Sequence, residues 1–334
     1  MHAVRLHPDG PRHEQIPIPA PGPGQVLVRM HASPINPNDL LFLGGDYEVV
    51  KPLPVVAGFE GSGVVVGAGQ GLLPRLLVGR RVAVVAGPGD GTWAEYTCAP
   101  ADGCVPLRTR VDLDQAAMLL TNPLTAQVLY AKATRGRRRP FVQNAAAGSL
   151  GRMITRLAVR DGVPAVHVVR RPAEAESLLA LGAEHALATQ DPDFDTTLAE
   201  TCTRLGIDYA LDPVAGDDTG RLLAALVPGG TVVVYGKLSG RPCVVDGDDL
   251  IFRNKRVEGF TMYTWVAETS KLGQLRMVFT AQGALDGDLG SEIRARIPLA
   301  RFEEALASLR AESGGGKILL VPTENEVSSE PGAP

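Results

Sequence analysis

The chain has 334 residues, of which 45% are hydrophobic, and its formal net charge is −4 at pH 7. This length predicts about two globular domains with buried cores. The high hydrophobic fraction excludes an intrinsically disordered chain. The slightly acidic charge gives no basis for binding nucleic acid.

The cysteines and the apolar segments exclude two further classes of protein. Cys98, Cys104, Cys202 and Cys243 are widely spaced, so the sequence predicts neither a disulfide framework nor a structural zinc site. No apolar stretch reaches the length of about 18 residues that a membrane-spanning helix needs. The first residues also lack the apolar core of a signal peptide. We therefore expect a cytoplasmic protein that does not enter a membrane.

Residues 1–118 are rich in glycine and proline and predict an irregular β domain. Asn36 and Pro37 can begin a short helix that reaches Leu43, because asparagine is a good cap and proline fits the first helical position. Turn residues separate the expected strands. These strands are Gln25–Ala32, Gly63–Gly67, Arg80–Ala86 and Trp93–Thr97.

The middle third alternates short β-branched runs with helical patterns. The runs are Phe141–Gln143, Ala165–Val169, Tyr209–Leu211, Thr231–Tyr235 and Arg256–Phe260. The helical patterns are Leu150–Val159, Ala173–Leu181, Asp193–Thr203 and Asp217–Leu226. Such alternation predicts a doubly wound parallel sheet, which binds ligands beyond the carboxyl ends of its strands.

A glycine-containing turn follows the first of these strands. Its pattern is Ala146-x-Gly148-x-x-Gly151, in which alanine replaces the first glycine of the dinucleotide-binding fingerprint. The free amides at the start of the next helix can bind a pyrophosphate. The turn therefore indicates a dinucleotide cofactor.

Arg170 and Arg171 follow the second strand and bear on which cofactor is used. Folds selective for NAD have an acidic residue about 20 residues beyond the fingerprint, bonded to the ribose. Two guanidinium groups in that place could instead bind a 2′-phosphate. The arginines predict NADPH as the cofactor; the alternative is that both are solvated surface charges.

Two helical patterns and one strand follow the sheet region. The helical patterns are Thr264–Gln282 and Arg301–Leu309, and the strand is Lys317–Val321. We expect one domain from residues 1–118 and 264–334, and a dinucleotide-binding domain from residues 119–263. Residues 322–334 are polar and contain proline, which predicts a disordered tail.

Several segments, in collinear order, resemble the medium-chain dehydrogenase/reductase superfamily. They are Pro34–Asp39, Gly58–Gly63, Gly91–Tyr96, Asn122–Ala126, Gly182–His185 and Gly314–Ile318. Three details are most similar to the NADPH-dependent 2-enoyl thioester reductases of the mitochondrial type, namely Gly45–Tyr47, Gln143–Ala145 and Leu250–Phe260. Quinone oxidoreductases share most of these motifs. The resemblance implies an α/β protein with a Rossmann domain, a discontinuous GroES-like catalytic domain, an active-site cleft at their junction, and a homodimer.

The resemblance also shows a departure from the zinc-dependent alcohol dehydrogenases. Those enzymes have a cysteine at the position of Asn36 and a histidine at the position of Phe59. A catalytic zinc needs about three nitrogen or sulfur ligands, and two of the usual three are absent. We therefore expect no metal, and an acceptor that needs no Lewis acid, such as an enoyl thioester or a quinone.

Tyr47 corresponds to the proton donor of the enoyl thioester reductases that the chain resembles. An ordinary phenol has a pKa of about 10 and stays protonated at neutral pH, as a general acid requires. The structural alternative is a tyrosine that packs in a loop between the domains and bonds a backbone carbonyl. Tyr47 favours enoyl thioester reduction over quinone or enone reduction, because a quinone needs no dedicated proton donor to carbon.

The resemblance assigns cofactor contacts to residues of several loops. They are Asn122, Thr125, Ala147, Gly148, Ser149, Leu150, Gly151, Arg170, Arg171, Tyr235, Gly236, Lys237, Leu238, Phe260, Thr261, Met262 and Lys317. Several of these residues could instead have a purely structural role. Asn122 could be a helix cap, Gly236 a simple turn, residues 260–262 core or interface packing, and Lys317 a solvated surface lysine.

The segment Arg135–Arg139 has four arginines in five positions. A solvated loop is the ordinary explanation. Alternatively, the loop attracts the phosphates of coenzyme A or the acidic face of a carrier protein. A function of another class also stays open, that of a catalytically quiet NADPH-binding protein, because a fold does not by itself determine a function.

Overall fold

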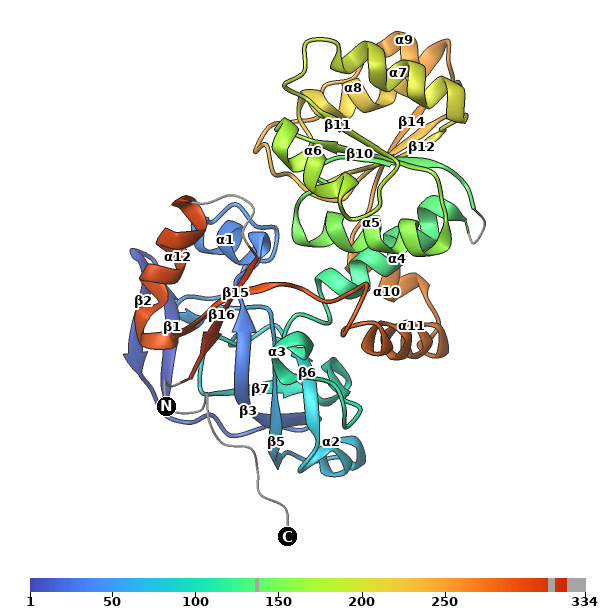
Figure 1. The fold of residues 1–334 in the computed structure, drawn as a ribbon. Coiled ribbons are helices and arrows are strands. Elements are labelled where there is room, and N and C mark those ends of the chain that lie inside the picture. Colours follow the sequence, from blue (N-terminus) through green and yellow to red (C-terminus); the bar gives the residue numbers. More distant parts are fainter. Residues whose placement is uncertain (136–137, 312–315, 323–334) are drawn as a thin grey trace. The chain divides into compact units, whose positions relative to one another are not determined.

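The computed structural model describes residues 1–135, 138–311 and 316–322. The chain forms two compact units, coloured along the sequence in Figure 1. The first unit comprises Met1–Thr121, Gln282–Asp286 and Gly290–Pro334, and the second comprises Asn122–Ala281 and Gly287–Leu289. Nearly all of the tail predicted to be disordered, residues 323–334, lies outside the described residues.

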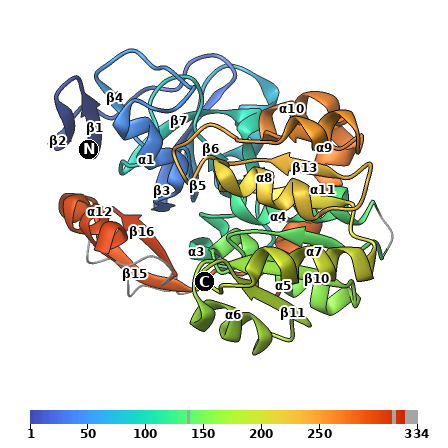
Figure 2. The same cartoon turned by 90° about the horizontal axis from the view of Figure 1, so that it is seen from above.

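The first unit is built mainly on antiparallel strands, although two of its strands, β15 and β16, pair in parallel. A small sheet has the order β2-β1-β4, and a larger sheet has the order β15-β16-β3-β5-β6-β8, with β7 also paired to β3. The strands are β1 His2–His7, β2 Gly10–Gln15, β3 Gln25–Pro34, β4 Val55–Val56, β5 Glu60–Ala68, β6 Arg81–Val85, β7 Tyr96–Pro100, β8 Cys104–Pro106, β15 Ile293–Pro298 and β16 Lys317–Val321. The helices are α1 Pro37–Gly44, α2 Leu72–Leu77, α3 Leu113–Ala116 and α12 Phe302–Ala311. Figure 2 shows α12 alongside β15 and β16.

The second unit contains one parallel sheet with the strand order β11-β10-β9-β12-β13-β14. The strands are β9 Phe141–Gln143, β10 Ala165–Val169, β11 His185–Ala188, β12 Tyr209–Asp212, β13 Thr231–Val234 and β14 Arg256–Gly259. The helices are α4 Asn122–Thr134, α5 Ser149–Asp161, α6 Pro172–Leu179, α7 Phe194–Leu205, α8 Asp217–Ala225, α9 Gly247–Ile251, α10 Met262–Glu268 and α11 Lys271–Gly283. In Figure 1, α4 and α5 lie on one face of the sheet and α7 and α8 on the other.

This strand order is that of the Rossmann fold and confirms the predicted fold class. The central strands are mainly apolar, as expected for strands covered on both faces; every residue of β10 is buried. Val142, Val166, Leu198 and Val232 belong to one buried cluster that joins the sheet to α7. Burial of these side chains stabilises the strands that carry the candidate site at their carboxyl ends.

The sequence prediction lacks several short elements of the first unit, among them strands β1, β2, β4, β8 and β15, and two features of the second unit also differ from it. Strand β11, His185–Ala188, is missing from it, because His-Ala-Leu-Ala has no β-branched residue and lies at a half-buried edge of the sheet. Residues 264–281 lie in the second unit, whereas the domain boundary expected from sequence assigns them to the catalytic domain. Helical periodicity does not show which core a helix packs against. Among the described residues, no helix is long and apolar enough to cross a membrane.

Candidate functional site

The turn between β9 and α5 has the backbone of a dinucleotide-binding turn. A Cβ atom added at Gly151 would lie 2.6 Å from the Cα of Ala146, so only glycine lets the first turn of α5 lie against the turn before it. Ala146 itself is fully buried, and the left-handed backbone falls on Ala145, with a φ of 46°. Alanine therefore replaces the first glycine of the fingerprint without strain at its own position.

Arginines gather at the carboxyl ends of β9 and β10. Arg170 and Arg171 directly follow β10 and are exposed. The guanidinium of Arg171 pairs with Glu174 at 2.6 Å, in the first turn of α6. The sequence analysis misses a third arginine, Arg152, whose Nε donates to the carbonyl of Ala147 at 2.9 Å. Its position directly after Gly151 is the signal that could have identified it.

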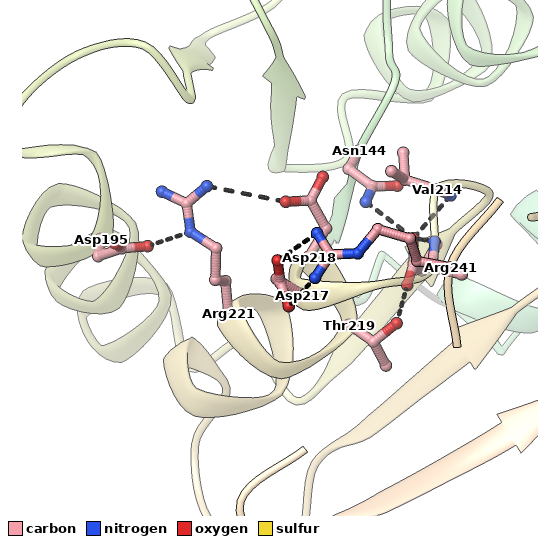
Figure 3. Close-up of polar contacts among 10 residues, drawn as sticks. Asn144, Asp195, Val214, Asp217, Asp218, Thr219, Arg221 and Arg241 are labelled. Carbon is pink, nitrogen blue, oxygen red and sulfur yellow. Dashed lines mark hydrogen bonds and ion pairs between the residues drawn. The ribbon is translucent and has the colours of Figure 1, made fainter. Parts of the chain in front are cut away.

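The buried carboxylate of Asp212 connects the carboxyl ends of β12 and β9, the two strands at the centre of the sheet. Asp212 ends β12, is fully buried, and accepts a hydrogen bond of 2.8 Å from Nδ2 of Asn144, which follows β9. The same carboxylate accepts from the backbone of Val214 and Ala215 and, at 2.6 Å, from the hydroxyl of Thr219 (Figure 3). Strands β9 and β12 flank the point where the strand order reverses, which is where folds of this kind bind nucleotides.

The loop after β13 packs on this network. A Cβ atom added at Gly236 would lie 2.6 Å from the carbonyl oxygen of Pro213, so glycine permits the close approach of these two backbone segments. The amide of Leu238 donates to the same carbonyl at 3.0 Å. The loops after β9, β12 and β13 therefore form one hydrogen-bonded edge.

One polar atom at this edge is unsatisfied by the protein. The amide nitrogen Nδ2 of Asn144 donates to the carboxylate of Asp212. The atom of this side chain that has no partner is therefore the amide oxygen Oδ1, which is an acceptor. Oδ1 of Asn144 is buried, and no described residue donates to it. Buried acceptors are rarely left unpaired, so the edge fits a ligand that brings a hydrogen-bond donor.

Exposed polar pairs surround helix α8 without joining the buried network. Arg241 pairs with Asp217 at 2.7 Å, and Arg221 pairs with Asp195 at 2.7 Å and with Asp218 at 3.7 Å (Figure 3). Exposed pairs of this type contribute little to stability. They are therefore a charged rim of the loop that follows β12.

Other predicted cofactor residues lie at the ends of helices in the second unit. Asn122 and Thr125 occupy the first turn of α4, and Thr125 is buried. After β14, the hydroxyl of Thr261 accepts a hydrogen bond from the amide of Thr264 and so caps α10. Phe260 and Met262, on either side of Thr261, are half-buried. Tyr47 and Lys317, in contrast, lie in the first unit.

A buried polar cluster occupies the first unit; we call Asn36, Asp39, Glu60 and Lys317 the Asn36 cluster. Nδ2 of Asn36 donates to Glu60 at 2.8 Å, and Nζ of Lys317 donates to Oδ1 of Asn36. Asp39 accepts from the backbone amides of Asn36 at 2.7 Å and Phe59 at 3.1 Å. Lys317 is only 6% exposed, so its alternative interpretation as a solvated surface lysine is wrong.

Burial shifts the protonation of all three charged members of this cluster. It raises the pKa of Asp39 to about 7, and the charge of Glu60 adds to this shift. It also raises the pKa of Glu60 and lowers that of Lys317. The carboxyl groups of Asp39 and Glu60 and the ammonium group of Lys317 are all buried and act on one another electrostatically. The protonation state of each group therefore depends on the charges of the other two.

Tyr47 lies just beyond α1 in an aromatic group. Its ring packs on Phe59 with centroids 5.2 Å apart at an angle of 62°, and Phe42 packs on the same ring at 5.3 Å. Nζ of Lys51 lies 5.3 Å from the Phe59 centroid and donates to the carbonyls of Gly87 and Gly89. These edge-to-face contacts hold the Tyr47 ring against the side chain of Phe59, whose backbone amide donates to Asp39.

The positions that bind zinc in the alcohol dehydrogenases have other roles here. The side chain of Asn36 is committed to Glu60 and Lys317, and that of Phe59 to aromatic packing. Within the described residues no group of three or more histidine, cysteine, aspartate or glutamate side chains is placed to hold a metal ion. The residues present at these positions do not fit a catalytic zinc.

Comparisons with known proteins agree with this architecture. Residues 22–109 match the alcohol dehydrogenase GroES-like domain, and residues 149–276 match the zinc-binding dehydrogenase family. The chain is 31% identical over 322 residues to the mitochondrial enoyl-[acyl-carrier-protein] reductase of Xenopus tropicalis, covering 93% of this chain and 91% of that relative. The protein belongs to the medium-chain dehydrogenase/reductase superfamily. It is accordingly an oxidoreductase of that superfamily.

Solved structures of this superfamily resemble the chain over nearly its whole length. A proposed NADPH:quinone reductase from Mesorhizobium loti has a TM-score of 0.90 and 30% identity, with 96% of this chain and 98% of that chain covered. A mycobacterial structure complexed with NADPH has a TM-score of 0.82 and 26% identity, with 96% and 100% covered. The similarity therefore extends to both reductase types that the sequence motifs resemble.

Proposed function

We propose that this protein uses NADPH to reduce the conjugated double bond of a 2-enoyl thioester. The observation that carries the proposal is the pair Arg170–Arg171 directly after β10, where an NAD-selective fold has an acid. The mycobacterial structural neighbour complexed with NADPH and the enoyl-[acyl-carrier-protein] reductase relatives support it.

The cofactor residues divide by the part of the dinucleotide that they would hold. The amides at the start of α5, from Ser149 to Gly151, would bind the pyrophosphate. Arg170 and Arg171 would bind the 2′-phosphate, and Arg171 would exchange its pair with Glu174 for this dianion. The unsatisfied oxygen of Asn144 offers an acceptor at the strand-order reversal.

The carboxyl-edge loops and the helix starts would hold the nicotinamide side. These residues are Asn122, Thr125, Tyr235, Gly236, Lys237, Leu238, Phe260, Thr261 and Met262, whereas Ala147 and Gly148 belong to the turn that would bind the pyrophosphate. Lys317 is assigned by resemblance to the same function, although its ammonium is bonded to Asn36 in the first unit.

The bound nicotinamide would supply a hydride to the β-carbon of the acceptor. The chain would then supply a proton to the α-carbon, and we assign this proton to the hydroxyl of Tyr47. Phe59 holds the tyrosine ring, and Asp39 holds the backbone of Phe59. No step requires a metal, because Asn36 and Phe59 occupy the positions of zinc ligands.

Reduction of a quinone or an enone is the second candidate, favoured by the likeness to the Mesorhizobium loti structure. A quinone accepts its protons on oxygen, which exchanges protons with water without a dedicated acid. The two candidates therefore differ in their need for Tyr47. A catalytically quiet NADPH-binding protein would bind the cofactor and oxidise it with neither acceptor.

The substitution Tyr47→Phe tests the assignment. It should lower kcat for crotonyl-CoA by about tenfold or more, because it removes a general acid, and leave the dissociation constant of NADPH unchanged. Tyr96→Phe is the matched control, since Tyr96 lies in β7 of the same unit. Unchanged turnover of crotonyl-CoA by Tyr47→Phe would reject the role.

We also propose a homodimer joined through the edge of the cofactor sheet. Every residue of the edge strand β14 is exposed. Ile251 and Phe252 beside it are 72% and 79% exposed, and Tyr263 in α10 is 63% exposed. Exposed apolar side chains along an unpaired edge favour pairing with a second copy. The mass in solution, measured by light scattering, tests this; a monomer at micromolar concentration would contradict it.

A further inference from the structure

The amino-terminal edge of the same sheet carries a pocket that the proposed function does not use. Its volume is about 320 Å³, and we call it the amino-edge pocket. It is lined by Lys132, Arg135, Tyr209, Thr231, Arg256 and Glu258.

The floor of the pocket crosses three neighbouring strands. Tyr209, Thr231 and Arg256 are the first residues of β12, β13 and β14, and they are paired in register. The opposite end of β12 is Asp212, in the candidate cofactor site. Lys132 lies in the last turn of α4, whose first turn holds Asn122. The pocket and the cofactor site therefore lie at opposite edges of one sheet.

This placement decides how the arginine-rich segment is interpreted. The guanidinium of Arg135 lies 6.0 Å from the ring centroid of Tyr209, and Arg139 pairs with Asp208, just before β12. Arg137 lies outside the described residues. The described arginines of this segment therefore face the amino-terminal edge of the sheet, away from the place where a thioester would meet the nicotinamide.

The chemistry of the lining points to a doubly charged anion. Lys132, Arg135 and Arg256 are exposed cations, and none forms an ion pair with a described residue. Glu258 is the single acidic residue of the lining, so the net charge is +2. A phosphate monoester carries about −1.5 to −2 at neutral pH. The charge of the lining therefore matches one such group.

The hydroxyls of two residues of the lining add hydrogen-bond donors. Tyr209 and Thr231 are 5% and 6% exposed, and neither hydroxyl bonds to another described residue. Burial, together with the charge of Glu258, raises the pKa of Tyr209, so its phenol remains a donor. Glu258 is an acceptor beside these donors, and it would bind a hydroxyl or ammonium group of the ligand.

We propose that the amino-edge pocket binds a small phosphate monoester that carries a hydroxyl or amino group near the phosphate. The donors Lys132, Arg135 and Arg256 take the phosphate, and Glu258 takes the neighbouring group. This site is separate from the cofactor site and does not depend on which acceptor the enzyme reduces. Two of its residues, Arg256 and Glu258, belong to β14, the strand through which we propose that two copies pair, so the pocket would lie next to the dimer interface.

Calorimetric titration of the full chain with glycerol 3-phosphate tests the proposal. One saturable site per chain is expected, and Arg256→Gln should weaken binding by about tenfold or more, because a charge-assisted bond is lost. Arg204→Gln is the matched control: Arg204 is an exposed arginine of α7 that does not line the pocket. An unchanged dissociation constant for NADPH shows that both variants are folded.

Three results would overturn the proposal. They are the absence of saturable binding at millimolar concentration, equal weakening by Arg256→Gln and Arg204→Gln, and equal affinity for inorganic phosphate, which lacks the group that Glu258 would bind. A titration with coenzyme A distinguishes the source of the ligand. Tighter binding than that of glycerol 3-phosphate, lost in Arg256→Gln, would identify a nucleotide phosphate.

Discussion

Replacement of Glu60 by glutamine should destabilise the first unit strongly. Glu60 is 2% exposed, and its Oε2 accepts from the amides of Leu120 at 3.1 Å and Thr121 at 2.9 Å. Its Oε1 accepts from Asn36, which in turn accepts from Lys317. Thr121 is the residue at which the chain leaves the first unit, so the carboxylate anchors this crossing point.

The size of the effect follows from the number of donors that meet Glu60. A glutamine keeps one acceptor oxygen, but its amide nitrogen must face either Asn36 or the two backbone amides. One set of donors is therefore left unpaired, and Lys317 loses the negative charge near it. An unsatisfied buried donor costs about 1–3 kcal/mol, and the cost is larger where a charged group is left without compensation. We expect the free energy of unfolding to fall by about 3 kcal/mol.

Urea unfolding followed by the fluorescence of Trp93 measures this loss. Trp93 is fully buried in the first unit, and Trp265→Phe removes the other tryptophan of the chain. The control is Glu303→Gln, an exposed glutamate of α12 in the same unit, which should change stability by less than about 0.5 kcal/mol. If Glu60→Gln behaves like this control, the anchoring role of the Asn36 cluster is wrong.

Further predictions concern pH, cofactor choice and the glycine turn. Because the pKa of folded Asp39 is raised to about 7 from 3.8, its contribution to stability is lost as pH rises across that range. In Asp39→Asn the free energy of unfolding should therefore decrease less steeply between pH 3.8 and about 7. Urea unfolding at several pH values measures this dependence, and the same dependence in the variant and the unmodified protein would contradict the prediction. Arg171→Glu should lower the ratio of specificity constants for NADPH over NADH by about tenfold or more; an unmoved ratio rejects the phosphate role. Gly151→Ala should destabilise the second unit by about 1–3 kcal/mol and weaken NADPH binding. Gly247→Ala, where an added Cβ meets nothing within 4 Å, should do neither in the same denaturation and titration assays.

The parallel sheet was predictable because its strands are locally encoded. Ala165–Val169 and Thr231–Val234 are short apolar runs between helical patterns, and these are the signals of a covered strand. Strand β11 lacked this signal, because none of its four residues is β-branched and three of them are only half-buried. Its pairing with β10 is a tertiary property, which local propensity does not encode.

The candidate site was predictable where it follows from chain position. Residues that follow parallel strands meet at one edge, so Gly148, Arg170 and Gly236 could be placed together from sequence. Arg171 pairs with Glu174, a local partner three residues away. The bond between Asn144 and Asp212 joins residues distant in sequence, and nothing in either local pattern indicates it.

The polar cluster of the first unit was the least predictable part. Lys317 and Asn36 are separated by most of the chain, and their bond depends on β16 pairing with β3. A lysine next to glycines in sequence resembles a surface residue, yet this one is buried. Burial of a charged group is decided by its partners, and those partners come from other strands.

We propose above that the protein is a Tyr47-dependent NADPH reductase of enoyl thioesters. The most direct test follows the loss of NADPH absorbance with crotonyl-CoA, a longer enoyl-CoA and benzoquinone in parallel, for the unmodified protein and for Tyr47→Phe. We expect a higher kcat/KM for an enoyl-CoA than for benzoquinone, and a loss of activity in Tyr47→Phe that is confined to the enoyl-CoA substrates. Oxidation of NADPH by benzoquinone alone, with the same rate in both proteins, would contradict it.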